Sequence, residues 1–126
     1  MGCGERILLV ESDPEVLSAT CACLARLGYE PLQAEGLAQG VQVVAVDRKR
    51  PDLVLTEDGT PGQVDELCSA LDAAGSCTPV VLVTASPAPD LIRRPDNVCR
   101  VISKPVDMRS LGRALRHCLT HALRAI

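Results

Sequence analysis

The side chains that could take part in chemistry are a few acids and hydroxyls and one ammonium, each directly after a short apolar run. In chain order they are Glu11, Ser12, Asp13, Glu57, Asp58, Thr84 and Lys104. Carboxylates are hard oxygen ligands for divalent cations, and an ammonium with a hydroxyl stabilises negative charge on a transferring group. These groups suit metal-assisted chemistry on an anionic substrate, provided that the fold brings them together.

The elements that must position them are predicted by the alternation of apolar runs with amphipathic stretches. Strands are expected at residues 6–10, 29–34, 53–55, 79–84 and 98–102. Pro31 interrupts the second run and indicates an edge strand. We predict an α/β fold, a flavodoxin-like (βα)5 doubly wound parallel sheet with strand order 2-1-3-4-5. That order brings the strands' carboxyl ends together at one crevice.

Helices are expected between the strands, each with an apolar stripe. The first, at 14–27, begins either with a capping box from Ser12 to Glu15 or with Asp13 as N-cap and Pro14 in the first turn. The predicted buried stripes are Leu17, Cys21 and Leu24; Leu37, Val41 and Val44; Val64, Leu67, Cys68 and Leu71; and Leu111, Leu115, Cys118 and Ala122. Three prolines between residues 87 and 95 leave room only for a short fourth helix at 90–94.

Composition predicts one domain over residues 1–126. The 126 residues, 47% of them hydrophobic, are enough for one core, and no apolar stretch approaches the roughly 18–20 residues of a membrane span. We therefore expect a cytoplasmic domain without a membrane partner. Tyr29 is the only aromatic residue, and the net charge is −3, so nucleic-acid binding is not expected. The arginines of the last helix are interpreted as a solvated basic face.

Seven cysteines invite a metal or disulfide interpretation that their spacing does not favour. There is no CxxC pair, and an odd number is awkward for a disulfide framework. We expect reduced cysteines that act as small apolar residues. His117 and His121 lie four apart without an adjacent thiol or carboxylate, so they are interpreted as surface residues and no metal site is predicted.

Four segments together resemble the receiver domains of bacterial two-component response regulators. They are Ile7-Leu8-Leu9-Val10-Glu11-Ser12-Asp13-Pro14-Glu15, the segment 51–62, Val83-Thr84-Ala85 and Ser103-Lys104-Pro105. The resemblance covers nearly the whole chain, in the right order. It implies that an aspartate after the third strand accepts a phosphoryl group and, with acids after the first strand, holds Mg²⁺. It also implies that a Ser or Thr binds a phosphoryl oxygen and that a Lys neutralises charge.

This chain departs from that pattern at the acids. Counting forward from Pro51 and backward from Pro61 both reach Glu57, so a glutamate stands where the family has its phosphoacceptor aspartate. Glu11 suits the acid pair, but Ser12 replaces a metal-ligating acid. A displacement of about 1 Å can cost on the order of a hundredfold in rate. We therefore expect weak or absent Mg²⁺ binding, no phosphorylation and no catalytic residue.

The switch residues are altered as well. Val101 stands where signalling members of the family usually carry an aromatic residue, and valine cannot repeat a ring's rotation. Thr84, Lys104 and Pro105 are kept, and the resemblance implies a cis bond before Pro105. The preferred interpretation is a degenerate receiver that binds a protein partner, such as a histidine kinase or an output domain, without phosphorylation.

Other interpretations of the same residues stay open. Ser12 is expected to cap the first helix rather than to act in chemistry, Glu57 to form a permanent ion pair with Lys104, and Thr84 to bond only the following turn. A working receiver could use Asp58, although strand alternation would point Asp58 away from Glu57. An unrelated α/β enzyme or nucleotide-binding protein is disfavoured, because the chain has no glycine-rich phosphate loop and no nucleophile–base pair.

Overall fold

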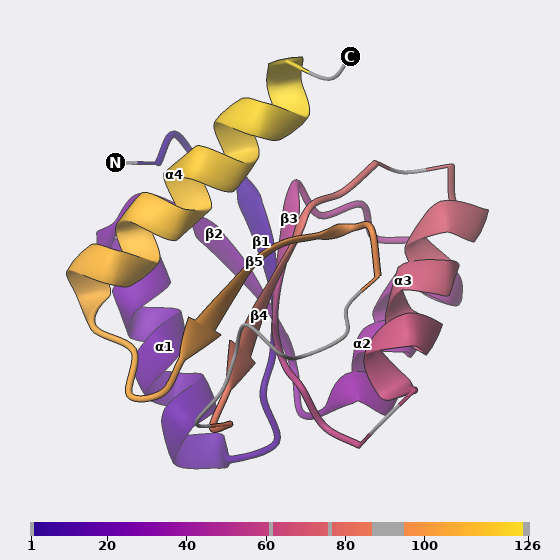
Figure 1. Ribbon diagram of the computed structural model, residues 1–126, viewed down its shortest axis with the longest axis horizontal. Coiled ribbons are helices and arrows are strands. Elements are labelled where there is room, and N and C mark those ends of the chain that lie inside the picture. The colour runs from indigo at the N-terminus through magenta and orange to yellow at the C-terminus, as the bar shows by residue number, and fades with distance from the viewer. Residues whose placement is uncertain (1, 61, 76, 87–94, 125–126) are drawn as a thin grey trace.

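The computed structural model describes residues 2–60, 62–75, 77–86 and 95–124, with the backbone alone for 121–124. A five-stranded parallel sheet lies between two layers of helices (Figure 1). The strands are β1 (Arg6–Val10), β2 (Glu30–Ala34), β3 (Leu53–Glu57), β4 (Val80–Thr84) and β5 (Val98–Ser103). Their order is β2-β1-β3-β4-β5, so the predicted flavodoxin-like topology is confirmed, with β2 at an edge.

The helices are α1 (Pro14–Arg26), α2 (Leu37–Ala45), α3 (Gln63–Ala73) and α4 (Met108–Arg124). Figure 1 shows α1 and α4 on one face of the sheet and α2 and α3 on the other. The predicted helix at 90–94 lies outside the described residues, as does the side chain of Ala122. Among residues 2–60, 62–75, 77–86 and 95–124, no helix combines the length and hydrophobicity needed to cross a bilayer.

Strand alternation divides the core into two clusters. Leu8 and Val10 of β1 belong to the cluster covered by α2 and α3, whereas Ile7 and Leu9 belong to the cluster beneath α1 and α4. The predicted stripe of α3 is fully confirmed, since Val64, Leu67, Cys68 and Leu71 are all buried. The same alternation decides, further along each strand, on which side of the sheet a polar side chain lies.

The prediction that all cysteines are reduced is wrong for one pair. Cys99 of β5 and Cys118 of α4 form a disulfide, with their Cα atoms 6.0 Å apart, which is a normal separation for such a bond. Cys3, Cys21, Cys23, Cys68 and Cys77 are free thiols. Spacing along the chain carried no signal for the pair, because packing of α4 on the sheet brings the two residues together.

Candidate functional site

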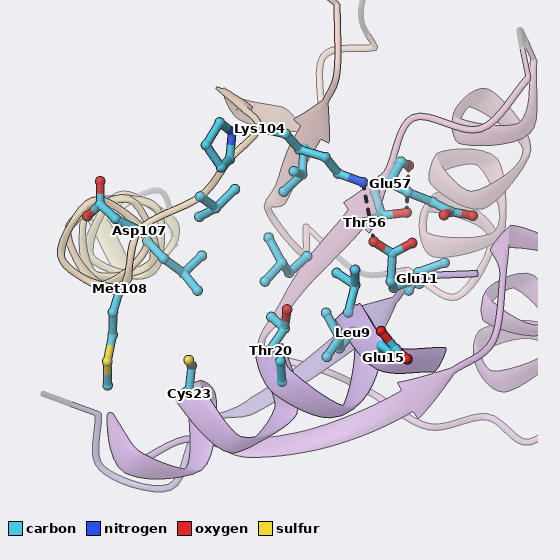
Figure 2. A pocket seen from close by; sticks show the side chains of 18 residues that line it. Leu9, Glu11, Glu15, Thr20, Cys23, Thr56, Glu57, Lys104, Asp107 and Met108 are labelled. Atoms are coloured by element: carbon cyan, nitrogen blue, oxygen red, sulfur yellow. Dashed lines mark hydrogen bonds and ion pairs between the residues drawn. The ribbon is translucent and has the colours of Figure 1, made fainter. Parts of the chain in front are cut away.

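The carboxyl ends of β1, β3, β4 and β5 carry the polar residues that the sequence predicts. Glu11 follows β1 and is buried, Glu57 ends β3 and is half-buried, and Thr84 ends β4 with no exposed surface. Lys104 follows β5 and extends over the sheet toward Glu11 (Figure 2). The fold therefore gathers the predicted residues at one edge of the sheet, but they separate into two groups of contacts.

The first group is built around Glu57 and Ser12. The backbone N–H of Ser12 donates to Oε1 of Glu57 at 3.0 Å, and the Ser12 hydroxyl donates to the same oxygen at 2.7 Å. The expectation that Ser12 caps α1 is therefore wrong. Ser12 instead connects the end of β1 to the end of β3, using both of its donors on one carboxylate oxygen.

Asp13 is the N-cap of α1. Its Oδ1 accepts from the backbone N–H of Glu15 at 2.9 Å and of Val16 at 3.4 Å, and Pro14 occupies the first helical position. This confirms the second of the two predicted starts for the helix. The Asp13 carboxylate is thereby committed to the helix and does not join Glu57.

Lys104 pairs with Glu11, not with Glu57. Its Nζ lies 3.4 Å from Oε1 of Glu11, and the Glu11 side chain is only 8% exposed. The predicted permanent ion pair between Glu57 and Lys104 is therefore wrong. Glu11 lies deeper, and burial makes it the acid that most needs a compensating charge.

The pKa of Glu11 reflects this environment. Burial raises it, whereas hydrogen bonding with the Glu57 side chain, a hydrogen bond from the Asp13 N–H and the Lys104 ammonium lower it. The lowering contributions prevail, so the pKa of Glu11 lies below its ordinary value of 4.5. Glu11 is therefore held as a carboxylate beside a second acid.

The second group is built around Thr84 and Asp58, at the ends of β4 and β3. The Thr84 hydroxyl donates to Oδ2 of Asp58 at 2.7 Å and accepts from the backbone N–H of Ser86 at 3.0 Å. Thr84 thus bonds the following turn, as expected, but it also binds Asp58. Asp58 and Glu57 have different partners, in agreement with the expected alternation.

Val101 and Pro105 are the remaining residues that the family resemblance singled out. Val101 is half-buried and packs against the core cluster beneath α2 and α3. The bond between Lys104 and Pro105 is cis, as the family resemblance implies. Both residues belong to the connection that leads from β5 into α4.

The carboxylates do not assemble into a magnesium shell. Glu57 is engaged by Ser12, Glu11 by Lys104, Asp13 by the start of α1 and Asp58 by Thr84. Mg²⁺ requires near-octahedral oxygen ligands, and the ammonium beside Glu11 opposes a second cation at that carboxylate. Within the part of the chain that the structure describes, no three His, Cys, Asp or Glu side chains are grouped to hold a metal ion. The donor set does not fit the ion, and no step is derived through it.

The structure also has a cavity of about 640 Å³ between α1 and the connection from β5 to α4, which the sequence did not predict (Figure 2). Its polar end holds Glu11, Glu57 and Lys104, and the rest is largely apolar. A signal was available in the short side chains of Ala19 and Cys23, four residues apart on one face of α1, in a chain without Phe or Trp.

The chain was compared with family models, curated proteins and solved structures. No family model matches the chain. The sensor histidine kinase AruS of Pseudomonas aeruginosa is 33% identical over 116 residues, which are 86% of this chain and 11% of that protein. The chain thus spans about a tenth of the length of this curated relative.

Solved structures match over nearly the full length. The signal receiver domain of an HD domain-containing protein from Pseudomonas fluorescens Pf-5 is 28% identical, with a TM-score of 0.78 and coverage of 96% of this chain and 98% of that one. A response regulator receiver domain from Clostridium thermocellum has a TM-score of 0.81 at 18% identity, with 97% and 99% covered.

Proposed function

Given that the chain is a receiver domain of the two-component type, we propose that it acts without phosphorylation, as a protein-interaction module in signal transduction. The observation that carries the proposal is the pair of hydrogen bonds from Ser12 to Glu57. At the position where a receiver accepts a phosphoryl group, this chain has a longer carboxylate that is already bound from within.

Two physical arguments support the loss of phosphoryl chemistry. The attack of a carboxylate on an anionic donor needs divalent metal and ammonium to offset repulsion. In this chain Ser12 supplies a neutral hydroxyl in place of a ligand, and the Lys104 ammonium is paired with Glu11. We propose that Mg²⁺ binding is weak or absent and that the domain has no enzymatic activity of its own.

The internal contacts also favour one fixed conformation. The Thr84 hydroxyl is committed to Asp58, and Val101 has no ring to rotate. A surface that does not switch serves a partner that recognises one state. Receiver domains of two-component systems interact with histidine kinases or output domains, and we propose a protein of that kind, in the cytoplasm, as the partner.

The test is intact-protein mass spectrometry after incubation with Mg²⁺ and acetyl phosphate. Four proteins are compared: the native chain, Glu57→Asp, Ser12→Asp/Glu57→Asp, and Asp58→Asn in the native background. We expect no phosphoryl group on the native chain and one on the double variant, because it restores a short acceptor and a second acid beside Glu11.

A phosphoryl group on the native chain would overturn the proposal. The Asp58→Asn protein would then show whether Asp58 is the acceptor. If this variant is not modified, the acceptor is Asp58, and Thr84 is the hydroxyl beside it. If the double variant is also unmodified while its circular dichroism is native, Ser12 and Glu57 are not the residues that disable phosphorylation, and the proposed cause is wrong.

A further inference from the structure

We propose that the cavity between α1 and the β5–α4 connection binds a small organic cation with an apolar body, of the class of primary alkylamines. The site goes beyond protein interaction, because it assigns a small-molecule ligand to the domain. Its volume of about 640 Å³ lies within the range of roughly 300–1,000 Å³ typical of small-molecule sites. Its largely apolar lining with a few polar groups at one end is also typical of such sites.

One wall of the cavity is a stripe along α1. Val16, Ala19, Thr20 and Cys23 follow each other at helical spacing and all line the cavity. From Val16 to Cys23 the helix rises about 10 Å, at roughly 1.5 Å per residue. Apart from Val16, their side chains are too short to reach across toward α4, which is why the space stays open.

The opposite wall comes from the β5–α4 connection and the start of α4. Val106, Met108 and Leu111 line it, and Figure 2 shows Met108 and Cys23 at the end remote from Glu11. A methionine is flexible and adapts to ligands of different shape. Val16, on the facing wall, is 39% exposed. It is one of two large hydrophobic side chains that are exposed among the described residues. Covering these apolar atoms would contribute favourable free energy.

The charge of the lining selects a cation. Among the described residues that line the cavity are four acids, Glu11, Glu15, Glu57 and Asp107, and one cation, Lys104. Lys104 is paired with Glu11, and Glu57 accepts from the neutral donors of Ser12 and is also in hydrogen-bonding contact with the Glu11 side chain. Asp107 accepts hydrogen bonds from Ser110 and lies beside Met108, at the end of the cavity remote from Glu11 (Figure 2). At the polar end an ammonium group would lie near the carboxylates of Glu11, Glu15 and Glu57 and one cation, Lys104, so the local charge favours a cation over an anion.

The dimensions favour a small molecule over a partner helix. A helix with its side chains is about 10–12 Å across, so a partner helix would place only part of one face in a space of this volume. A bare metal ion would leave the apolar stretch from Val16 to Cys23 uncovered. An unbranched chain that ends in an ammonium uses both the charge at one end and the apolar length.

The test uses octylammonium on the intact domain, with the alkylation of Cys23 as the readout. Cys23 lines the cavity, whereas Cys3 and Cys77 are exposed elsewhere and serve as internal references. We expect octylammonium near saturation to slow alkylation of Cys23 by about tenfold, because about a tenth of the sites stay empty at a ligand concentration ten times Kd. Alkylation of Cys3 and Cys77 should not change.

Octanoate is the matched control for charge, since it has the same apolar length and the opposite sign. It should protect Cys23 at least tenfold more weakly than octylammonium. Equal protection by both compounds would overturn the cation assignment, and protection by neither would overturn the site. Protection of Cys3 and Cys77 together with Cys23 would mean non-specific binding and would count against the proposal.

Two matched variants locate the site. Ala19→Leu places a larger side chain into the cavity and should abolish protection by octylammonium. Ala22→Leu makes the same change on the same helix, at a residue that does not line the cavity, and should leave protection intact. If octylammonium still protects Cys23 in both variants, the ligand binds elsewhere. The comparison of octylammonium with octanoate on the native protein decides the matter even if Ala19→Leu does not fold.

Discussion

The hydroxyl and the backbone N–H of Ser12 donate to the same carboxylate oxygen of Glu57, at 2.7 Å and 3.0 Å. This contact joins the ends of β1 and β3, the strands that flank the crevice of the fold. The two residues that replace acids of the receiver pattern are therefore direct partners. The substitutions form one unit, in which the serine supplies donors to the acid that replaces the acceptor.

The contact between Ser12 and Glu57 should be measurable in a double-mutant cycle. Ser12→Ala removes the hydroxyl donor, and Glu57→Ala removes the acceptor. We expect a coupling free energy of about 1 kcal/mol, because a hydrogen bond to a charged group is worth more than a neutral one but Ser12 is exposed and water replaces it in part. Urea denaturation of the four proteins gives the value.

Glu15 provides the control for that cycle, because it is a nearby acid with no hydrogen bond to Ser12. Ser12→Ala and Glu15→Ala should be additive within about 0.5 kcal/mol. A coupling near zero for Ser12 with Glu57, equal to that of the control, would contradict the arrangement.

The ion pair between Lys104 and Glu11 should contribute more to stability than the exposed pair on the same sheet. Lys104→Met leaves the buried Glu11 carboxylate without its cation, and we expect a loss of about 1–2 kcal/mol, reduced from the fully buried case because the Lys104 side chain is 40% exposed. Arg6→Met is the matched control. Its pair with Glu30 is 4.0 Å long with side chains 50% and 59% exposed, so its loss should stay below about 0.5 kcal/mol.

Chemical denaturation of both variants at neutral pH measures the difference. Equal losses in Lys104→Met and Arg6→Met would mean that the depth of Glu11 does not matter. The Glu11→Gln/Lys104→Met protein should recover part of the loss, since it no longer holds an unpaired charge.

Stability should fall in acid in a way that depends on Glu11. Its pKa is lowered by folding, so the unfolded chain binds more protons and the contribution of Glu11 is complete above its ordinary value of 4.5. The contribution is then lost as the pH falls from about 4.5 through the lower folded pKa. Denaturation as a function of pH should show a weaker decline for Glu11→Gln in this window. Identical slopes for the two proteins would indicate that the pKa of Glu11 is not lowered.

Reduction should destabilise the domain through the Cys99–Cys118 bond. The bond closes a loop of 19 residues, for which the entropic model gives about 3 kcal/mol. Urea denaturation with and without dithiothreitol measures the loss, and the Cys99→Ala/Cys118→Ala protein should show no effect of the reductant. If dithiothreitol also leaves the stability of the native protein unchanged, Cys99 and Cys118 are not joined by a disulfide.

The sequence by itself determined the element order and the strand topology. Continuous apolar runs at β1, β3 and β4 predicted strands, and Pro31 predicted that β2 lies at an edge. The stripe of α3 is encoded in spacing alone. Such features are local, because periodicity and turn residues act over a few positions of the chain, and they are therefore legible without the tertiary structure.

The choice of partners at the site was decided only by the tertiary structure. Sequence placed Glu11, Ser12, Glu57 and Lys104 at strand ends, yet it favoured Lys104 beside Glu57 and Ser12 as a cap. Lys104 pairs with Glu11 because Glu11 is more deeply buried than Glu57. Ser12 bonds Glu57 because β1 lies beside β3. Partner choice depends on burial and on distances of an ångström between segments far apart in sequence, and no local pattern carries that information.

The disulfide and the cavity were also decided only by the tertiary structure. Cys99 and Cys118 meet because α4 packs on the sheet, and the space beside Ala19 exists because the facing connection does not fill it. Both follow from how whole elements pack, which sums many contacts across the chain. The residue types were visible in the sequence, but the distances between them were not.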